Sequence, residues 1–363
     1  ELTKVFFPKG KYDWLRSVAR LKGFDVKTGD FTVQARVENT KSKSQNQRFQ
    51  SESNQYIKRI IELEKDIDLL SRVKEYTPEK FIITAPNKNK KHEATAIFQW
   101  SDWHVDEVVE SKTVNGLNEY NKHIAKQRAF KLFENCVKVA NTQRQGVTIK
   151  TAIIQLGGDA IGAYIHPELQ QTNSMSPLEG IFYAKELTIA GLEYVLENGG
   201  FEQIIVITNR GNHPRLTPKM QYANDYSMNL ETFLFVSLAD YFKNEKKISF
   251  KIEQSELNYI TVYDRVLRFF HGHQIKSSGG IGGLTIPLYK QIHRWNDTNP
   301  AYYNFMCDKH VYSNPTPDCQ VNGSLKGYDA YAISHGFKMQ PPIQSFTLLD
   351  SKYGITIKAP VFC

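Results

Sequence analysis

The sequence is poor in cysteine and has no long apolar run. Its 363 residues include four cysteines, none of them in a CxxC pair. A disulfide scaffold and a cysteine zinc ribbon are therefore disfavoured, and a reducing compartment is favoured. No apolar stretch approaches the roughly 20 residues that cross a bilayer, so we expect no membrane partner. With 40% hydrophobic and 12% aromatic residues, the chain can still build a substantial core.

The chain beyond residue 92 lacks an excess of either charge. Residues 1–92 hold 20 of the 46 Lys and Arg residues and 12 of the 38 Asp and Glu residues, so the whole net charge of +8 lies there. This asymmetry suggests a partner with a phosphate backbone, and the alternative is a solvated basic face. We predict a basic N-terminal extension over residues 1–92 and a catalytic domain over residues 93–363.

The extension combines helical and linker-like segments. Residues 13–22 and 54–75 have helical periodicity. Residues 41–53 are low in apolar content, which is typical of a linker or of a segment that orders on binding. The helix over 54–75 would connect the two parts or contact a partner.

The second part alternates strand-like and helical segments, which is typical of an α/β protein. Strands are predicted over 95–100, 151–156, 203–208, 302–306 and twice within 258–270. Helices are predicted over 118–141, 182–196 and 228–242. Loops that follow strands in such proteins commonly carry the chemistry.

Five polar clusters follow these strands. They are SDWH at 101–104, GGD at 157–159, GNH at 211–213, HGH at 271–273 and CDKH at 307–310. Each cluster alone is common by chance, but their order at successive strand ends predicts a metal site. Oxygen and imidazole ligands without a thiolate cluster suit a pair of ions such as Mn²⁺, Mg²⁺, Fe or Zn²⁺.

The spacing within the clusters has a physical logic. Asp102 and His104 are one residue apart, so on an extended segment they point the same way and can hold one ion. The two oxygens of Asp159 can bridge two ions. Two bridged ions can clamp a phosphate and activate a water between them.

The series D-x-H, G-D, G-N-H, H and x-x-H resembles the calcineurin-like metallophosphoesterase superfamily over roughly residues 94–360. Some phrases resemble a bacteriophage-encoded branch: SDWHVDE at 101–107, NGLNEYN at 115–121, NGSLKGYDAYA at 322–332 and PPIQSFTLLDSKYGIT at 341–356. The resemblance implies an α/β (α+β) fold, a two-sheet β-sandwich flanked by helices, to which the basic helical extension is appended. It implies a cytoplasmic location, in the host if the protein is phage-encoded.

The resemblance also implies residue roles. The metal ligands would be Asp102, His104 and His310 for the first ion, Asp159 as the bridge, and Asn212 and His271 for the second ion. His213 would stabilise the transition state or protonate the leaving oxygen, and a bridging hydroxide would attack phosphorus in line. Mn²⁺ is the expected cofactor, with Mg²⁺, Fe or Zn²⁺ as alternatives.

The GNH cluster departs from the family pattern at its end. Pro214 stands where the family has an acid that orients the catalytic His, and Asp225 or another acid could replace it. Arg215 follows, and its paired donors suit a phosphate oxygen; the alternative is an exposed loop arginine.

The last cluster also departs from the pattern. Asp308 stands where the family has a histidine, and a carboxylate there favours a harder ion. A rival alignment takes the last ligand from Ser334-His335-Gly336. In the HGH cluster we expect His271 to ligate and His273 to contact substrate.

These features predict a two-metal phosphodiesterase that hydrolyses nucleic acid, DNA above all, and binds it through residues 1–92. The first alternative is a phosphatase or a nucleotide or cyclic-nucleotide phosphodiesterase. The second is a degenerate scaffold in a replication or virion assembly. The sequence leaves the oligomeric state open.

Overall fold

The computed structural model describes residues 92–276 and 283–363, and from the N-terminal part residues 24–25, 30–31, 47, 50–55, 57–61 and 64. The chain divides into two units, Glu1–Pro86 and Asn87–Cys363, and each is described by itself. The predicted boundary after residue 92 stays a prediction.

The described residues of the first unit form short elements. Strands β1 (Phe24–Asp25) and β2 (Asp30–Phe31) pair antiparallel. Residues 50–55 and 57–61 are helical, which agrees with the start of the helix predicted over 54–75. The helix predicted over 13–22 and the rest of 54–75 lie almost wholly outside the described residues.

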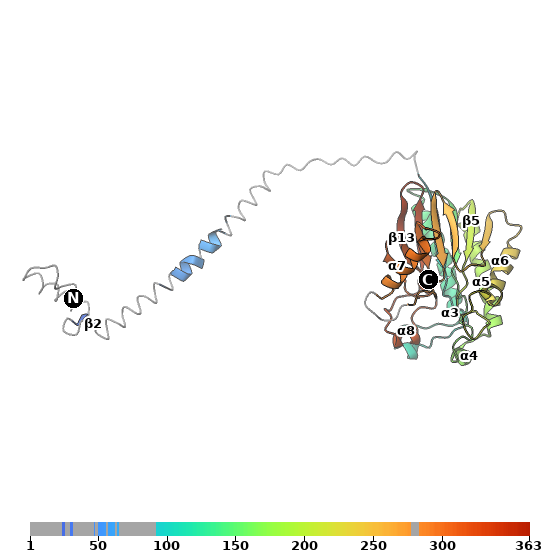
Figure 1. Cartoon of the computed structure of the whole chain (residues 1–363), viewed down its shortest axis with the longest axis horizontal. Helices are drawn as coiled ribbons and strands as arrows, with labels where there is room; N and C mark the ends of the chain where they lie inside the picture. Colours follow the sequence, from blue (N-terminus) through green and yellow to red (C-terminus); the bar gives the residue numbers. More distant parts are fainter. Residues whose placement is uncertain are drawn as a thin grey trace, which may run out of the picture. The chain divides into compact units, whose positions relative to one another are not determined.

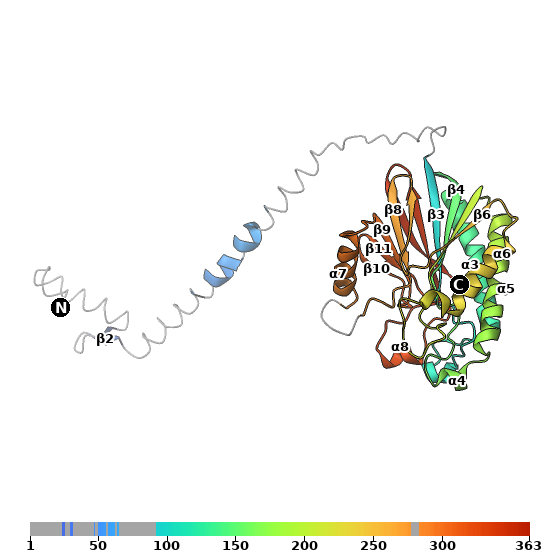
Figure 2. The ribbon, with the colours of Figure 1, turned by 45° about the vertical axis from the view of Figure 1, so that its right-hand side comes forward.

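The second unit has two sheets flanked by helices (Figures 1 and 2), so the predicted fold class is confirmed. The six-stranded sheet has the order β13-β12-β3-β4-β5-β6, and the five-stranded sheet has the order β10-β11-β9-β8-β7. The strands are β3 (Glu93–Trp100), β4 (Thr148–Leu156), β5 (Gln203–Thr208), β6 (Ile248–Ile252), β7 (Asn258–Val262), β8 (Arg265–Phe270), β9 (Tyr303–Met306), β10 (Ser313–Thr316), β11 (Cys319–Val321), β12 (Ile343–Asp350) and β13 (Gly354–Phe362). β3 to β6 run parallel, as do β8 and β9.

Helices cover both outer faces of this two-sheet sandwich. The longer ones are α3 (Lys122–Gln143), α5 (Pro177–Asn198), α6 (Leu230–Tyr241) and α7 (Thr285–Asn296), and the short ones are η1 (Ser111–Val114), α4 (Leu169–Thr172), η2 (Asp225–Ser227) and α8 (Ala330–Ser334). The start of α5 is specified locally, because Ser176 and Glu179 form a reciprocal capping box around Pro177 at the first helical position.

Three apolar clusters hold the layers together. The largest packs α3, α5 and α6 against the six-stranded sheet, and a third packs α7 against the five-stranded sheet. Between the sheets, Ile97, Ile153 and Phe269 belong to a cluster of aliphatic and aromatic side chains. Central strands buried on both faces need such continuous apolar sequences, which is why β4 and β5 were recognisable as strands.

Toward the carboxyl ends of the strands the inter-sheet layer becomes polar. Gln99 donates to Gln155 Oε1 at 2.9 Å, and Gln155 donates to Asn209 Oδ1 at 2.9 Å. The same three amides also donate to backbone carbonyls of the other sheet, at Met306 and Phe270 among others. This row of amides ties the two sheets together directly beneath the loops that carry the five clusters.

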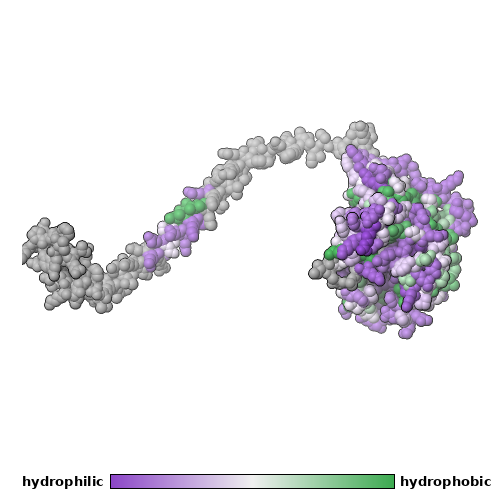
Figure 3. Space-filling view, viewed as in Figure 1, coloured by the Kyte–Doolittle hydropathy of each residue, from purple (hydrophilic) through white to green (hydrophobic). Residues whose placement is uncertain are grey.

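The described surface of the second unit is largely hydrophilic in the view of Figure 3, with apolar side chains near the edge where α5 and α6 lie. All four cysteines are free, as the scattered spacing predicts. Among the described helices, none combines the length and apolar character needed to cross a bilayer.

Candidate metal centre

The five clusters all lie in loops at the carboxyl ends of β3, β4, β5, β8 and β9. The first two loops are joined by their backbones, because Asp102 N donates to Gly158 O at 2.9 Å and His104 N donates to Asp159 O at 3.1 Å. Parallel strands end at the same edge of a sheet, so residues far apart in the sequence meet there.

The backbone of these loops is strained at the candidate ligands. Nine non-glycine residues of the described chain have a positive φ, and five of them belong to the clusters: Asp102, His104, Asp159, Asp308 and His310, with φ between 47° and 69°. Each such residue costs about 1–3 kcal/mol and persists only where its surroundings enforce it. Strain of this kind concentrates at functional sites.

Gly158 allows three of the ligand loops to approach one another closely. Its φ is +94°, and a Cβ atom there would lie 2.5 Å from Gly211 N and 2.8 Å from His271 Nδ1. A side chain at this position would separate the loops after β4, β5 and β8, which carry three of the clusters.

The first candidate cation position lies between Asp102, His104 and His310. The Nε2 atoms of His104 and His310 lie 3.2 Å apart, and His310 Nε2 lies 3.3 Å from Asp102 Oδ1. Burial opposes a charge on His310, but the carboxylate of Asp102 raises its pKa. Two ring nitrogens and a carboxylate oxygen thus face one point.

The second candidate cation position lies between Asp102, Asp159 and His271. His271 Nδ1 donates to Gly157 O at 2.7 Å, which leaves Nε2 directed at Asp159 Oδ2, 3.1 Å away. Asp308 Oδ1 lies 3.5 Å from the same nitrogen, so the structure brings Asp308 to this position.

The carboxylates and imidazole of the second position are strongly coupled in charge. Burial raises the pKa of Asp159, but the imidazoles of His271 and His213 outweigh burial and hold this pKa well below its usual range. Burial lowers the pKa of His271, but Asp159 and Asp308 raise it well above its usual value.

His213 lies beside a candidate ligand of each position, and its ring centroid is 4.7 Å from that of His104. Its backbone N donates to Asp159 Oδ1 at 2.9 Å, and its Nε2 lies 4.0 Å from Asp159 Oδ2. His104, Asp159 and His213 form a third group, whose ligand atoms lie close enough together to hold a cation. His213 Nδ1 lies 3.0 Å from Gly162 O, so a backbone carbonyl orients the ring where the family has an acid.

Asp225 does not take the place of that acid. Its carboxylate accepts from Arg210 Nε at 2.6 Å, and both side chains are buried. The loop that carries Gly162 is instead held by Asp106, which accepts from Gly162 N at 2.6 Å and from Ala163 N at 2.9 Å.

The remaining predicted site residues lie further from the candidate positions or have other partners. Arg215 donates to Asn212 O and to Thr217 O within its own loop. His273 Nε2 lies 3.6 Å from Glu256 Oε1. His335, the rival last ligand, is exposed at the end of α8.

A buried ion chain that no motif in the sequence indicates lies beneath the first position. Glu107 Oε1 lies 2.8 Å from His104 Nδ1, and Glu107 Oε2 lies 2.7 Å from Lys326 Nζ. Lys326 also contacts Asp329 at 2.7 Å. A carboxylate on the second nitrogen of a ligating His fixes its tautomer and raises its basicity, so Glu107 directs His104 Nε2 toward the cation position.

We expect Lys326→Met to lower the free energy of unfolding by about 3–5 kcal/mol, because Glu107 and Asp329 would stay buried without their cation. The measurement is urea-induced unfolding of metal-free protein followed by circular dichroism. Lys150→Met is the matched control, since the Lys150–Glu202 pair is exposed and is worth about 1 kcal/mol or less. Equal effects of the two substitutions would contradict the buried chain.

The ion chain also gives a pH dependence. Burial, followed by the charge of Lys326, lowers the pKa of His104 to about 4. The folded metal-free protein therefore binds fewer protons at His104 than the unfolded chain between about pH 4 and 6.5, and its stability falls as the pH falls through that window.

His104→Asn should remove up to about 1.4 kcal/mol per pH unit from the slope of unfolding free energy against pH in this window. Urea unfolding of the metal-free wild type and variant at pH 7.0, 5.5 and 4.5 measures the difference. Parallel pH profiles of the two proteins would show that His104 does not titrate as described.

The donor set fits divalent cations. Carboxylate and imidazole groups converge on the two positions, and in the loop after β5 Asn212 Oδ1 is buried without a hydrogen-bond partner. Buried polar atoms are normally satisfied, and a bound cation would satisfy this oxygen. Hard oxygen ligands mixed with imidazoles suit Mn²⁺, Mg²⁺, Fe or Zn²⁺.

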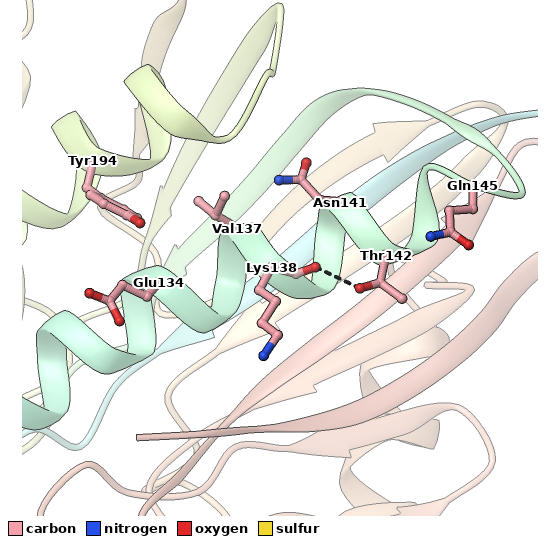
Figure 4. A pocket seen from close by; sticks show the side chains of 7 residues that line it. All are labelled: Glu134, Val137, Lys138, Asn141, Thr142, Gln145 and Tyr194. Atoms are coloured by element: carbon pink, nitrogen blue, oxygen red, sulfur yellow. Dashed lines mark hydrogen bonds between the residues drawn. The ribbon is translucent and has the colours of Figure 1, made fainter.

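A separate hollow of about 450 Å³ lies on the outer surface of α3, beside Tyr194 of α5 (Figure 4). Its lining includes Glu134, Lys138 and Thr142, and Thr142 Oγ1 donates to Lys138 O at 3.0 Å. None of the five clusters contributes to this lining, so it does not belong to the candidate metal centre.

No protein-family model and no curated protein matches the sequence. Solved structures to which this chain is similar include a predicted phosphoesterase from Streptococcus pneumoniae, at 11% identity and a TM-score of 0.29, over 74% of this chain and 98% of that one. Zinc-bound Vps29 from Entamoeba histolytica has 9% identity and a TM-score of 0.29, over 73% and 99%. A hypothetical protein from Pyrococcus horikoshii has 9% identity and a TM-score of 0.37, over 74% and 88%.

Proposed function

We propose that the protein is a calcineurin-like metallophosphoesterase, of a bacteriophage-encoded branch, that hydrolyses phosphodiester bonds of nucleic acid, DNA in particular. One observation carries this proposal. Ligands from both sheets converge on two adjacent cation positions that share Asp102, while Asp159 lies 3.1 Å from His271 and 4.0 Å from His213. A pair of neighbouring cations is the arrangement that clamps a phosphate for in-line displacement.

The residues divide between the two cations. Those that would hold the first are Asp102, His104 and His310, with Asp159 between the ions, and those that would hold the second are Asn212, His271 and Asp308. When bound, the two cations supply Lewis-acid polarisation of a phosphate and lower the pKa of a water between them. Asp308 adds a carboxylate, which supports Mn²⁺ as the resident ion.

His213 supplies the proton chemistry in this proposal. Its Nδ1 proton is held by Gly162 O, so its Nε2 faces the space beside Asp159 and can protonate the leaving oxygen. A carbonyl stabilises an imidazolium less than a carboxylate does, because it carries no full charge. Arg215 already donates to its own loop, and it would contact a phosphate only after exchanging one of these bonds.

The choice of nucleic acid rests on the charge distribution. Residues 1–92 carry the whole net charge of +8, and binding to a phosphate backbone requires such an excess and weakens as salt rises. A phosphatase or small-nucleotide diesterase has the same centre without a need for this charge. We propose DNA as the partner and the cytoplasm as the location.

The test uses metal-stripped full-length protein with labelled single- and double-stranded DNA, beside bis-p-nitrophenyl phosphate, and adds Mn²⁺, Mg²⁺ or Zn²⁺ in turn. We expect metal-dependent cleavage of DNA that falls steeply with salt. Cleavage of the small diester alone would replace DNA by a nucleotide-sized substrate. No turnover, with no metal bound after reconstitution, would overturn the proposal in favour of a scaffold.

A further inference from the structure

An exposed aromatic cluster lies at α8, outside the metal centre. Tyr331 is 55% exposed and Phe337 is 40% exposed. His335, between them in the sequence, and Lys338, directly after Phe337, are also exposed. The rings of Tyr331 and His335 stack with centroids 3.9 Å apart at 27°, and the Phe337 ring lies 5.9 Å from Tyr331. We call Tyr331, His335 and Phe337 the α8 platform.

The α8 platform is connected to the metal centre through buried charges. Asp329 caps α8 by accepting from Ala332 N at 2.8 Å, and its other oxygen contacts Lys326 at 2.7 Å. Lys326 contacts Glu107, which holds His104. Three contacts therefore link the cap of the helix to a candidate ligand, so the position of α8 is tied to that of His104.

The platform and the centre also share one end of the unit. Figures 1 and 2 show α8 at the end opposite the start of β3, and the candidate ligands Asp102 and His104 follow the carboxyl end of β3. A ligand that occupies the centre can thus extend toward α8.

We propose that the α8 platform stacks on a nucleobase of the substrate whose phosphate occupies the metal centre. This inference rests on the proposed function and specifies that the substrate presents an unpaired base. Every base has a π face, so aromatic platforms bind single strands with little sequence preference. Lys338 supplies positive charge beside the rings, which complements a phosphate backbone.

Several features of the cluster favour a base over an apolar protein partner. The rings of Tyr331 and His335 are already close to parallel, so a third flat ring can continue the stack. His335 and Lys338 are polar, whereas the buried core of a protein interface is depleted in charged residues.

The experiment compares equilibrium binding of a labelled 12-nucleotide single strand with that of the same strand bearing abasic sites. The full-length protein is held in EDTA, so that no bond is cut. We expect the wild type to prefer the ordinary strand. Tyr331→Ala with Phe337→Ala should weaken binding of the ordinary strand roughly 5–150-fold for each lost stack and leave binding of the abasic strand unchanged.

Two further variants make the result specific. Tyr331→Phe keeps the ring and should bind as the wild type does. Tyr353→Ala removes a ring that is 64% exposed and lies 5.1 Å from His92, in the turn after β12, at the end where β3 begins. It should have no effect.

Equal weakening of both strands by the double variant, or no weakening of either, would overturn the platform. If the wild type hydrolyses no diester, the proposed function fails. The binding preference for the ordinary strand over the abasic strand would still test the α8 platform, because that measurement does not depend on hydrolysis.

Discussion

Asp159→Asn is expected to reduce hydrolysis of every substrate by roughly 10³-fold or more and to lower the number of divalent cations bound per chain. Its carboxylate groups with Asp102 and His271 at the second position and with His104 and His213 in the third group, and in the proposed centre it would lie between the two cations. Asn keeps the size of the side chain and one oxygen that can accept from His213 N, so the fold should persist. The measurements are kcat/KM on bis-p-nitrophenyl phosphate and calorimetric titration with Mn²⁺.

The matched control for this substitution is Asp240→Asn, since Asp240 is a carboxylate of α6 with 72% of its side chain exposed. It should leave both measurements unchanged. An Asp159→Asn protein that binds two cations and turns over normally would remove Asp159 from the centre and with it the proposed mechanism.

His213→Ala should lower the rate of DNA cleavage by roughly 10²–10⁴-fold, the usual contribution of a general acid. The loss on bis-p-nitrophenyl phosphate should be much smaller, because nitrophenolate leaves without a proton. Mn²⁺ titration should still show two cations, since the other ligands remain. The comparison of the two substrates measures proton transfer separately from metal binding.

His123→Ala is the control for this second prediction, because His123 is an exposed histidine at the start of α3. It should behave as the wild type on both substrates. If His213→Ala lost activity equally on both substrates together with one cation, His213 would be a ligand, as its grouping with His104 and Asp159 allows.

Strands and helices could be predicted from local sequence where burial requires a continuous or periodic pattern of apolar residues. The strand predicted over 203–208 is β5 (Gln203–Thr208), and the helix predicted over 182–196 lies within α5 (Pro177–Asn198). Very short strands were harder to recognise. β10 (Ser313–Thr316) and β11 (Cys319–Val321) are short and contain polar residues and a proline, so their pairing depends on neighbours rather than on their own sequence.

The polar clusters were predictable because their order along the chain is a local property, whereas their supports were not. Glu107 and Lys326 are 219 residues apart in sequence and only 2.7 Å apart in space. Glu107 lies in the segment SDWHVDE and Lys326 lies in the segment NGSLKGYD. Nothing in either segment indicates that the two side chains form an ion pair. Gly162 O could not be found at all, since every residue offers a carbonyl.

The departures at Pro214 and Asp308 also show that a ligand can be predicted from its place in a motif, whereas a long-range supporting contact cannot. Asp308 was placed by the alignment of CDKH, and its carboxylate lies 3.5 Å from His271 Nε2. For the acid missing at Pro214, the sequence offered Asp225, but the buried pair with Arg210 was a long-range contact that no spacing could indicate.

The row of amides between the sheets has a consequence for metal uptake. Gln99 and Gln155 bond to carbonyls at the ends of β9 and β8, so the ligand loops of the two sheets keep their separation whether or not cations are bound. The centre is preorganised, because the loss of conformational freedom occurs during folding and not at binding. Loading and stripping of Mn²⁺ should therefore leave the far-ultraviolet circular dichroism of the protein unchanged.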